Sequence, residues 1–245
     1  MLGGLSGLSG PQFDFFHGVP LRSAYIIAAT FRCGSSHLAV SLWQTGRLGA
    51  PFEYLNYENE MRILYSRLKA ESPQDYLDRL IERRTTANGI FGIKAHFHHF
   101  QAALQQNSCL LEALRPLHFV YINRQDELAQ AVSLAKAFQT RAWISLMRPS
   151  RVRLFYSREF IDECREEIRT QKTDWECWFR DHGVSPLRVD YEDLLGQPTT
   201  VADRVLNLLG ARDDTPTKVS LPQVEKQSDS TNLAWITRYR TESVT

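Results

Sequence analysis

The sequence predicts an α/β fold in which helices flank a central parallel sheet. Short continuous apolar runs alternate along the chain with longer segments of helical periodicity, a pattern typical of strands that are buried on both faces. Helical crossovers between such strands make the sheet parallel and the connections right-handed. Of the 245 residues, 43% are hydrophobic, which is enough for a substantial core. Ligands are therefore expected beyond the carboxyl ends of the strands, where open α/β sheets bind them.

The first elements lie on either side of a short polar turn. Residues 24–29 (AYIIAA) form an apolar run that predicts a buried strand. Residues 35–45 carry one apolar stripe at helical spacing, and Gly46 marks the end of that helix. A further helix is expected over residues 56–69.

The next elements have clear start and stop signals. Ser72-Pro73 supplies an N-cap and a first helical residue, and the helix that they begin ends before Asn88-Gly89. Residues 90–94 (IFGIK) predict the second strand. The helix expected over residues 99–115 has a candidate break at Asn107-Ser108.

The second half of the chain continues the alternation of strands and helices. A third strand is expected at 118–123 (HFVYIN) and a fourth at 187–190 (LRVD). The expected helices cover residues 127–140, 156–181, 201–209 and 234–239.

Composition narrows the class of protein. The net charge is only +1, so a field that would recruit nucleic acid or an anionic membrane is not expected. The four cysteines form no CxxC pair, which argues against zinc and disulfides and favours the cytoplasm. No apolar run approaches the ~20 residues of a membrane span. We expect a flexible N-terminal tail over residues 1–20 and one domain over residues 21–245.

The turn after the first strand, Arg32-Cys33-Gly34-Ser35-Ser36, is a candidate anion site. Backbone N–H groups at a turn that opens a helix attract an anion, and Gly34 lets the backbone approach it. Neither GxGxxG nor the Lys of a Walker A loop is present. A plain strand–helix turn with nothing bound has the same pattern. Cys33 fits a small packing residue better than a nucleophile.

A second candidate site follows the third strand. Arg124 lies just past the strand, and Asp126 is a candidate helix cap. Ser133 lies nine residues after Arg124, so the chain would have to double back for both to reach one phosphate. Between Glu127 and Glu159 the chain has no acidic residue, which suits a multiply charged ligand or a solvated basic face.

These stretches resemble a sulfotransferase that uses 3′-phosphoadenosine 5′-phosphosulfate (PAPS), and more narrowly the bacterial trehalose 2-sulfotransferase family. The family's R-S-G-S-T-L-L reads RCGSSHL at residues 32–38. Its H-R-P-D…S-Q-A-V-S…Q-T-R-x-W is matched at 123–126 (NRQD), 129–133 (AQAVS) and 139–143 (QTRAW), and its G-x-P-x-E-[FY] at 49–54 (GAPFEY). The resemblance spans about residues 24–240; Cys33, Ser36, His37 and Gln125 depart from it.

The resemblance implies a P-loop-like sulfotransferase architecture and in-line transfer of a sulfuryl group to a hydroxyl of a carbohydrate or glycolipid. It implies Glu53 as general base, while Lys94 stabilises the sulfuryl oxygens or forms a structural salt bridge. The catalytic residues would be Glu53, Arg32 and Lys94. The donor would bind to Arg32, Cys33, Gly34, Ser35, Ser36, Arg124, Ser133 and Gln227. The acceptor would bind to Glu53, Tyr54, His96 and Trp143.

Several alternatives remain open from the sequence alone. A small-metabolite kinase and an inactive nucleotide-binding module of the same fold are both compatible with the turn at Arg32. The cluster His96, His98 and His99 lacks an evident carboxylate, so no metal is expected, and His96 or His98 can instead line the acceptor pocket. Tyr54, Trp143 and Trp175 fit core aromatics as well as sugar platforms. The family suggests a homodimer, and the acceptor is not identified.

Overall fold

A four-stranded parallel sheet forms the centre of the molecule, with strand order β2-β1-β3-β4. The computed structural model describes residues 8–15, 18–56, 60–222 and 227–242. The strands are β1 (Ser23–Ala29), β2 (Ile90–His96), β3 (Leu117–Asn123) and β4 (Leu187–Asp190). The predicted fold class is confirmed.

Helices connect the strands and continue past the last of them. They are α1 (Ser35–Gln44), α2 (Glu60–Leu68), α3 (Pro73–Arg84), α4 (Phe97–Gln106), α5 (Leu110–Ala113), α6 (Glu127–Thr140), α7 (Arg158–Asp181), α8 (Tyr191–Gly196), α9 (Pro198–Leu208) and α10 (Ser230–Glu242).

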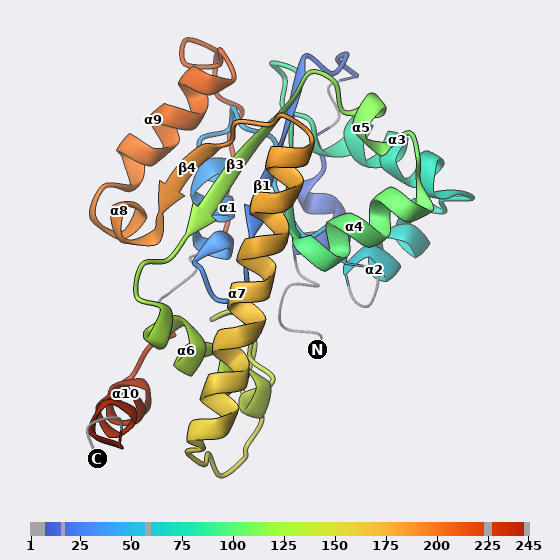
Figure 1. Cartoon of the computed structure of the whole chain (residues 1–245). Helices are drawn as coiled ribbons and strands as arrows, with labels where there is room; N and C mark the ends of the chain where they lie inside the picture. The colour runs from blue at the N-terminus through green and yellow to red at the C-terminus, as the bar shows by residue number, and fades with distance from the viewer. Residues whose placement is uncertain (1–7, 16–17, 57–59, 223–226, 243–245) are drawn as a thin grey trace.

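Alternate residues of β1 point to opposite faces of the sheet and build two separate cores. Ile26 and Ala28 pack in one core with residues of α3, α4 and α7. Tyr25 and Ile27 pack in the other with residues of α1 and α9. Figure 1 shows the resulting layers, with α7 crossing one face of the sheet and α1 and α9 on the other side.

A third apolar cluster lies beyond the carboxyl ends of the strands. Its members come from α6, the first half of α7, and α10. In Figure 1 these helices form the lower part of the molecule, on the side to which the strand arrows point. The edge of the sheet where ligands are expected therefore faces a second packed unit.

Most predicted elements appear with shifted ends. Ser72 accepts a hydrogen bond from the backbone of Asp75, and Asp126 accepts one from Ala129, so both predicted caps are confirmed. The expected helix over 99–115 is divided into α4 and α5, and the predicted break falls in the gap between them. Helix α8 had no counterpart among the predicted elements.

The N-terminal segment departs from the flexible tail expected over residues 1–20. Leu8 is buried, and Arg84 donates hydrogen bonds to the carbonyls of Leu8 and Phe13. The fully buried carboxylate of Asp14 pairs with Arg67 at 2.7 Å and with Arg84 at 3.2 Å. Residues 8–15 are thus attached to the domain by a buried charge cluster. Residues 1–7, 16 and 17 lie outside the described ranges.

No helix within these ranges combines the length and the apolar character needed to cross a bilayer.

The charge cluster at Asp14 yields a stability prediction. Asp14→Asn removes the carboxylate but leaves the buried Arg84 guanidinium in place, so we expect a loss of about 3–5 kcal/mol of unfolding free energy. Denaturant unfolding measures it. Asp75→Asn is the matched control, because Asp75 pairs with Arg79 at the surface and its loss should barely shift the curve. Equal effects of the two substitutions would contradict the structural role of Asp14.

Candidate active site

The loop that follows β1 is held in place by polar side chains from α6 and α7. The Gln130 amide donates to the Thr30 hydroxyl at 2.9 Å and to the Phe31 carbonyl at 2.6 Å. The Trp175 indole N–H donates to the carbonyl of Ala29 at 3.0 Å. Gln130 and Trp175 are completely buried. The loop is therefore fixed before any ligand arrives.

Gly34 gives this loop its shape. It has a left-handed φ of +92° and precedes α1, whose N-terminus has no side-chain cap. A Cβ atom at this position would lie 2.3 Å from a ring carbon of Tyr191. Glycine is therefore required here, and the first N–H groups of α1 stay available to an anion.

Two arginines lie side by side next to this loop. Arg124 donates to the carbonyl of Arg32 at 3.4 Å, and its guanidinium lies over the ring of Tyr191. The pKa of Arg32 is lowered to about 10, mainly by burial and to a smaller extent by the like charge of Arg124. Within the described part of the chain neither arginine forms an ion pair, and the buried Nε of Arg124 has no hydrogen-bond partner. Such a pair of cations is a strong anion site.

The Arg32 side chain joins three segments that are distant in sequence. Its Nε donates to the hydroxyl of Ser133 at 3.0 Å, and another guanidinium nitrogen donates to the Gln227 side chain at 2.6 Å. A third hydrogen bond goes to the carbonyl of Trp143. The predicted donor residues Arg32, Ser133 and Gln227 are thus brought together.

A continuous helix makes this possible, which differs from the expected doubling back of the chain. Helix α6 runs without interruption from Glu127 to Thr140, and it passes close enough to the loop for Ser133 to reach Arg32. Arg124 and Ser133 therefore meet through Arg32.

Glu53 is placed next to β2 by a short strand-like contact. Phe52 forms an isolated parallel bridge with Ile93, and its carbonyl accepts the Lys94 backbone N–H at 2.9 Å. The following residue, Glu53, then lies beside Lys94, and the two side chains form a buried ion pair. Asn56 donates to the other carboxylate oxygen of Glu53 at 3.0 Å.

These partners determine the charge state of Glu53. Burial alone would raise its pKa, but Lys94, His96 and the hydrogen bond from Asn56 together outweigh burial and lower the pKa of Glu53 to about 2. The same ammonium donates to the Ser36 hydroxyl at 3.0 Å. Lys94 therefore links Glu53 directly to the anion-binding loop, and both predicted roles of Lys94, salt bridge and catalytic cation, are compatible with this position.

His96 ends β2 on the same side of the sheet. Its Nε2 lies 4.0 Å from Glu53, its side chain is buried, and burial lowers its pKa to about 3. The rings of His98 and His99 lie about 6 Å from that of His96. Among the described residues no group of three or more His, Cys, Asp and Glu side chains has a geometry that would hold a metal ion.

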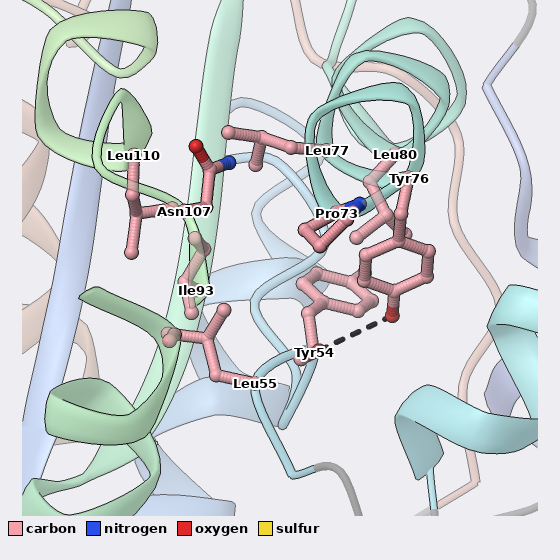
Figure 2. Close-up of a pocket in the computed structure, with 10 residues that line it drawn as sticks. Tyr54, Leu55, Pro73, Tyr76, Leu77, Leu80, Ile93, Asn107 and Leu110 are labelled. Atoms are coloured by element: carbon pink, nitrogen blue, oxygen red, sulfur yellow. Dashed lines mark hydrogen bonds between the residues drawn. The ribbon is translucent and has the colours of Figure 1, made fainter. Parts of the chain in front are cut away.

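Other predicted residues take structural positions. Tyr54 is fully buried, and its hydroxyl donates to the carbonyl of Ala50, so it takes the core position that was the alternative to its predicted contact with the acceptor. Figure 2 shows its ring in the wall of a small apolar cavity between α3 and β2, where Tyr76 donates to its carbonyl. Cys33 is buried among apolar residues, as a packing residue would be.

The basic stretch between Glu127 and Glu159 is mostly a solvated face. Lys136 pairs with Asp229 at 2.6 Å, and Arg158 lies near Asp162 and Glu242. The remaining arginines of the stretch are exposed: Arg141, Arg148, Arg151 and Arg153. Of the residues considered for the predicted second phosphate site, Arg124, Ser133 and Arg32 remain as candidates.

Three contributors were not singled out as site residues from the sequence. Gln130 anchors the loop, Tyr191 packs on Gly34 and Arg124, and Asn56 binds Glu53. For Tyr191, its position directly after the fourth predicted strand was a usable signal, because ligand contacts gather at strand ends. For Gln130, its place in the matched stretch at 129–133 (AQAVS) was a usable signal as well, whereas Asn56 had none, since its contact depends on an irregular loop.

Comparison with known proteins gives the following matches. A family model described as Stf0 sulphotransferase matches residues 24–242. Trehalose 2-sulfotransferase of Mycolicibacterium smegmatis is 30% identical, covering 90% of this chain and 96% of the relative. The enzyme of the same name from Mycobacterium tuberculosis is 26% identical, covering 89% and 95%. A solved sulfotransferase domain from the Synechococcus PCC 7002 olefin synthase has a TM-score of 0.50 at 15% identity, covering 91% and 96%, which supports the fold.

The shape of the Gly34 turn yields a second prediction. Gly34→Ala combines left-handed strain of about 1–2 kcal/mol with the contact against Tyr191, so it should destabilise more than strain alone. Gly183→Ala is the control, because Gly183 has a φ of +63° and open space around its Cβ position. Urea unfolding compares the two. Equal losses of unfolding free energy in the two variants would mean that the Tyr191 ring moves away from the new methyl group at no energetic cost.

Proposed function

Because this chain belongs to the Stf0 sulphotransferase family, we propose that it transfers a sulfuryl group from PAPS to a hydroxyl of a carbohydrate acceptor. The observation that carries the proposal is the cation pair of Arg32 and Arg124, joined through Ser36 and Lys94 to the buried Glu53. This arrangement joins a site for a multiply charged anion to a carboxylate that can accept a proton.

The donor fits the anion-binding groups in two parts. The first N–H groups of α1 and the hydroxyls of Ser35 and Ser36 would hold the 5′-phosphosulfate against the turn at Gly34. Arg124 and Ser133 would hold the 3′-phosphate, and Arg32, which contacts both Ser133 and Gln227, would help to hold the donor. The Nε of Arg124 has no partner among the described residues, which supports this assignment, since a buried donor without an acceptor is costly unless a ligand supplies one.

The transfer step needs charge stabilisation and proton removal. The Lys94 ammonium, which now contacts Ser36 and Glu53, would turn to the sulfuryl oxygens as charge moves toward the leaving phosphate. Glu53 is then released from its cation partner and draws the proton of the attacking hydroxyl, as a general base does. His96 and Trp143, whose rings both lie near the ring of Phe31, would contact the acceptor.

The acceptor class follows from the relatives. Both curated relatives are named trehalose 2-sulfotransferases, so a disaccharide or its glycolipid is the first acceptor to test. The four cysteines are free, which supports a reducing compartment such as the cytoplasm. A homodimer remains a prediction from the family resemblance.

Donor recognition is tested by thermal stabilisation with 3′,5′-ADP, 5′-AMP and ATP. At about 100 times its dissociation constant, 3′,5′-ADP should stabilise the protein by about 2.7 kcal/mol, or about 5–10 °C in Tm. The shift should be lost in Arg124→Ala and kept in Arg153→Ala, since Arg153 is exposed in the solvated basic stretch. A larger Tm shift with ATP and Mg²⁺ than with 3′,5′-ADP would favour a kinase. Equal Tm shifts with 5′-AMP and 3′,5′-ADP would contradict the assignment of PAPS as the donor.

The role of Glu53 is tested by Glu53→Gln, which keeps the hydrogen bond from Asn56 but removes the negative charge. We expect kcat for sulfuryl transfer to fall by about 10²–10⁴, while 3′,5′-ADP still stabilises the variant. Retained donor binding without turnover in the unaltered protein, with every acceptor tried, would instead indicate an inactive nucleotide-binding module. Unchanged kcat in Glu53→Gln would remove Glu53 from the mechanism.

A further inference from the structure

The carboxylate of Glu53 is poorly prepared to accept a proton by itself. One of its oxygens pairs with Lys94 and the other accepts a hydrogen bond from Asn56. A group next to Glu53 that is neutral and has a free lone pair would be a better first proton acceptor.

His96 is such a group. The strand register places His96 opposite Ala29, the last residue of β1 before the loop that would hold the donor. The Nε2 of His96 lies 4.0 Å from the Glu53 carboxylate. A carboxylate on that side favours the tautomer with the proton on Nε2. The other nitrogen, Nδ1, is buried and has no hydrogen-bond partner among the described residues. The lone pair on Nδ1 can therefore accept a hydrogen bond from the hydroxyl of an acceptor.

We propose that the His96 imidazole takes the proton of the acceptor hydroxyl, and that Glu53 stabilises the imidazolium that forms. The inference rests on the proposed sulfuryl transfer and changes one step of it: the hydroxyl proton goes to His96, and Glu53 acts as the partner of the ring in place of taking the proton itself. It parallels the carboxylate–histidine pairs of hydrolases, in which the carboxylate orients the ring and balances its charge.

The step balances without a further reactant. The acceptor oxygen forms a bond to sulfur while the bond between sulfur and the bridging phosphate oxygen breaks, and the electron pair stays on the leaving 3′,5′-ADP. The hydroxyl proton goes to Nδ1 of His96. The imidazolium remains paired with Glu53 until the product leaves, and then returns the proton to water.

The charges around His96 support this only when the donor is bound. Burial, with Lys94, His99 and His98 acting in the same direction, now keeps the pKa of His96 low, whereas the charge of Glu53 acts to raise it. When Lys94 turns to the sulfuryl group, its repulsion of the imidazolium weakens and the carboxylate becomes available to it. The pKa of His96 therefore rises in the complex that reacts.

The competing explanation is that His96 only packs. Its ring lies 4.7 Å from the ring of Phe31, so a structural role needs to be separated from a catalytic one. His96→Gln keeps hydrogen-bonding groups but cannot take up a proton. His99→Gln is the matched control, because His99 lies nearby and burial also lowers its pKa, to about 4.

The test measures the single-turnover rate constant and the steady-state kcat from pH 5 to 9. The proteins compared are the unaltered protein, His96→Gln, His99→Gln, Glu53→Gln and the double variant of His96 and Glu53. We expect His96→Gln to lose roughly 100-fold or more in kcat with little change in KM for PAPS, and the double variant to lose little more than the worse single one. His99→Gln should keep kcat within a few-fold. Added imidazole should restore part of kcat in His96→Gly, which a packing role does not predict.

Two further readouts separate the possible failures. The Tm shift with 3′,5′-ADP shows whether each variant still folds and binds donor. If His96→Gln does not fold, ¹⁵N-histidine NMR of the unaltered protein should show the pKa of His96 rising when 3′,5′-ADP and sulfate are added. A near-normal kcat in His96→Gln, or no such rise, would overturn the proposal and leave Glu53 as the base. No turnover and no donor binding in the unaltered protein would overturn the proposed function and this inference together.

Discussion

The rest of the site depends on holding two guanidinium groups together, with no carboxylate paired to either among the residues that the structure describes. Arg32 and Arg124 repel each other, and the repulsion must be offset by the surrounding structure. Gln130 and Trp175 fix the loop from two helices, Ser133 and Gln227 accept hydrogen bonds from Arg32, and the ring of Tyr191 lies against Arg124. Free energy gained in packing α6 and α7 is thus used to keep an anion site in its binding geometry, the preorganisation that transfer enzymes need.

The second half of the site is organised by the register of β2. Residues two apart on a strand point to the same side, so Lys94 and His96 project together from its end. The bridge between Phe52 and Ile93 then adds Glu53 from a segment that is otherwise irregular. One strand and one bridge therefore decide the distances among a carboxylate, an ammonium and an imidazole, and the chemistry tolerates little change in that register.

Local patterns carried much of the prediction, and long-range contacts explain what they missed. Apolar runs and caps are encoded within a few residues, so β1, α1 and the turn at Arg32 were predictable. Lys94 pairs with Glu53, which is 41 residues away, and contacts Ser36, which is 58 residues away. Both contacts depend on the order of the strands in the sheet, which no local pattern states. Tyr54 is the last residue of a motif that suggested a substrate contact. Its ring nevertheless turns into the core, because the residue before it, Glu53, faces the site.

Lys94 also makes the two ends of the site thermodynamically inseparable. One ammonium contacts the Ser36 hydroxyl, in the loop proposed to hold the donor, and the Glu53 carboxylate, on the side proposed for the acceptor, and it has only three protons to donate. Whatever binds at one end changes what Lys94 offers at the other, and linkage requires the effect to be equal in both directions. Donor and acceptor affinities in this protein are therefore joint properties of the pair of ligands, and an inhibitor shaped for one end will have a potency that depends on what fills the other.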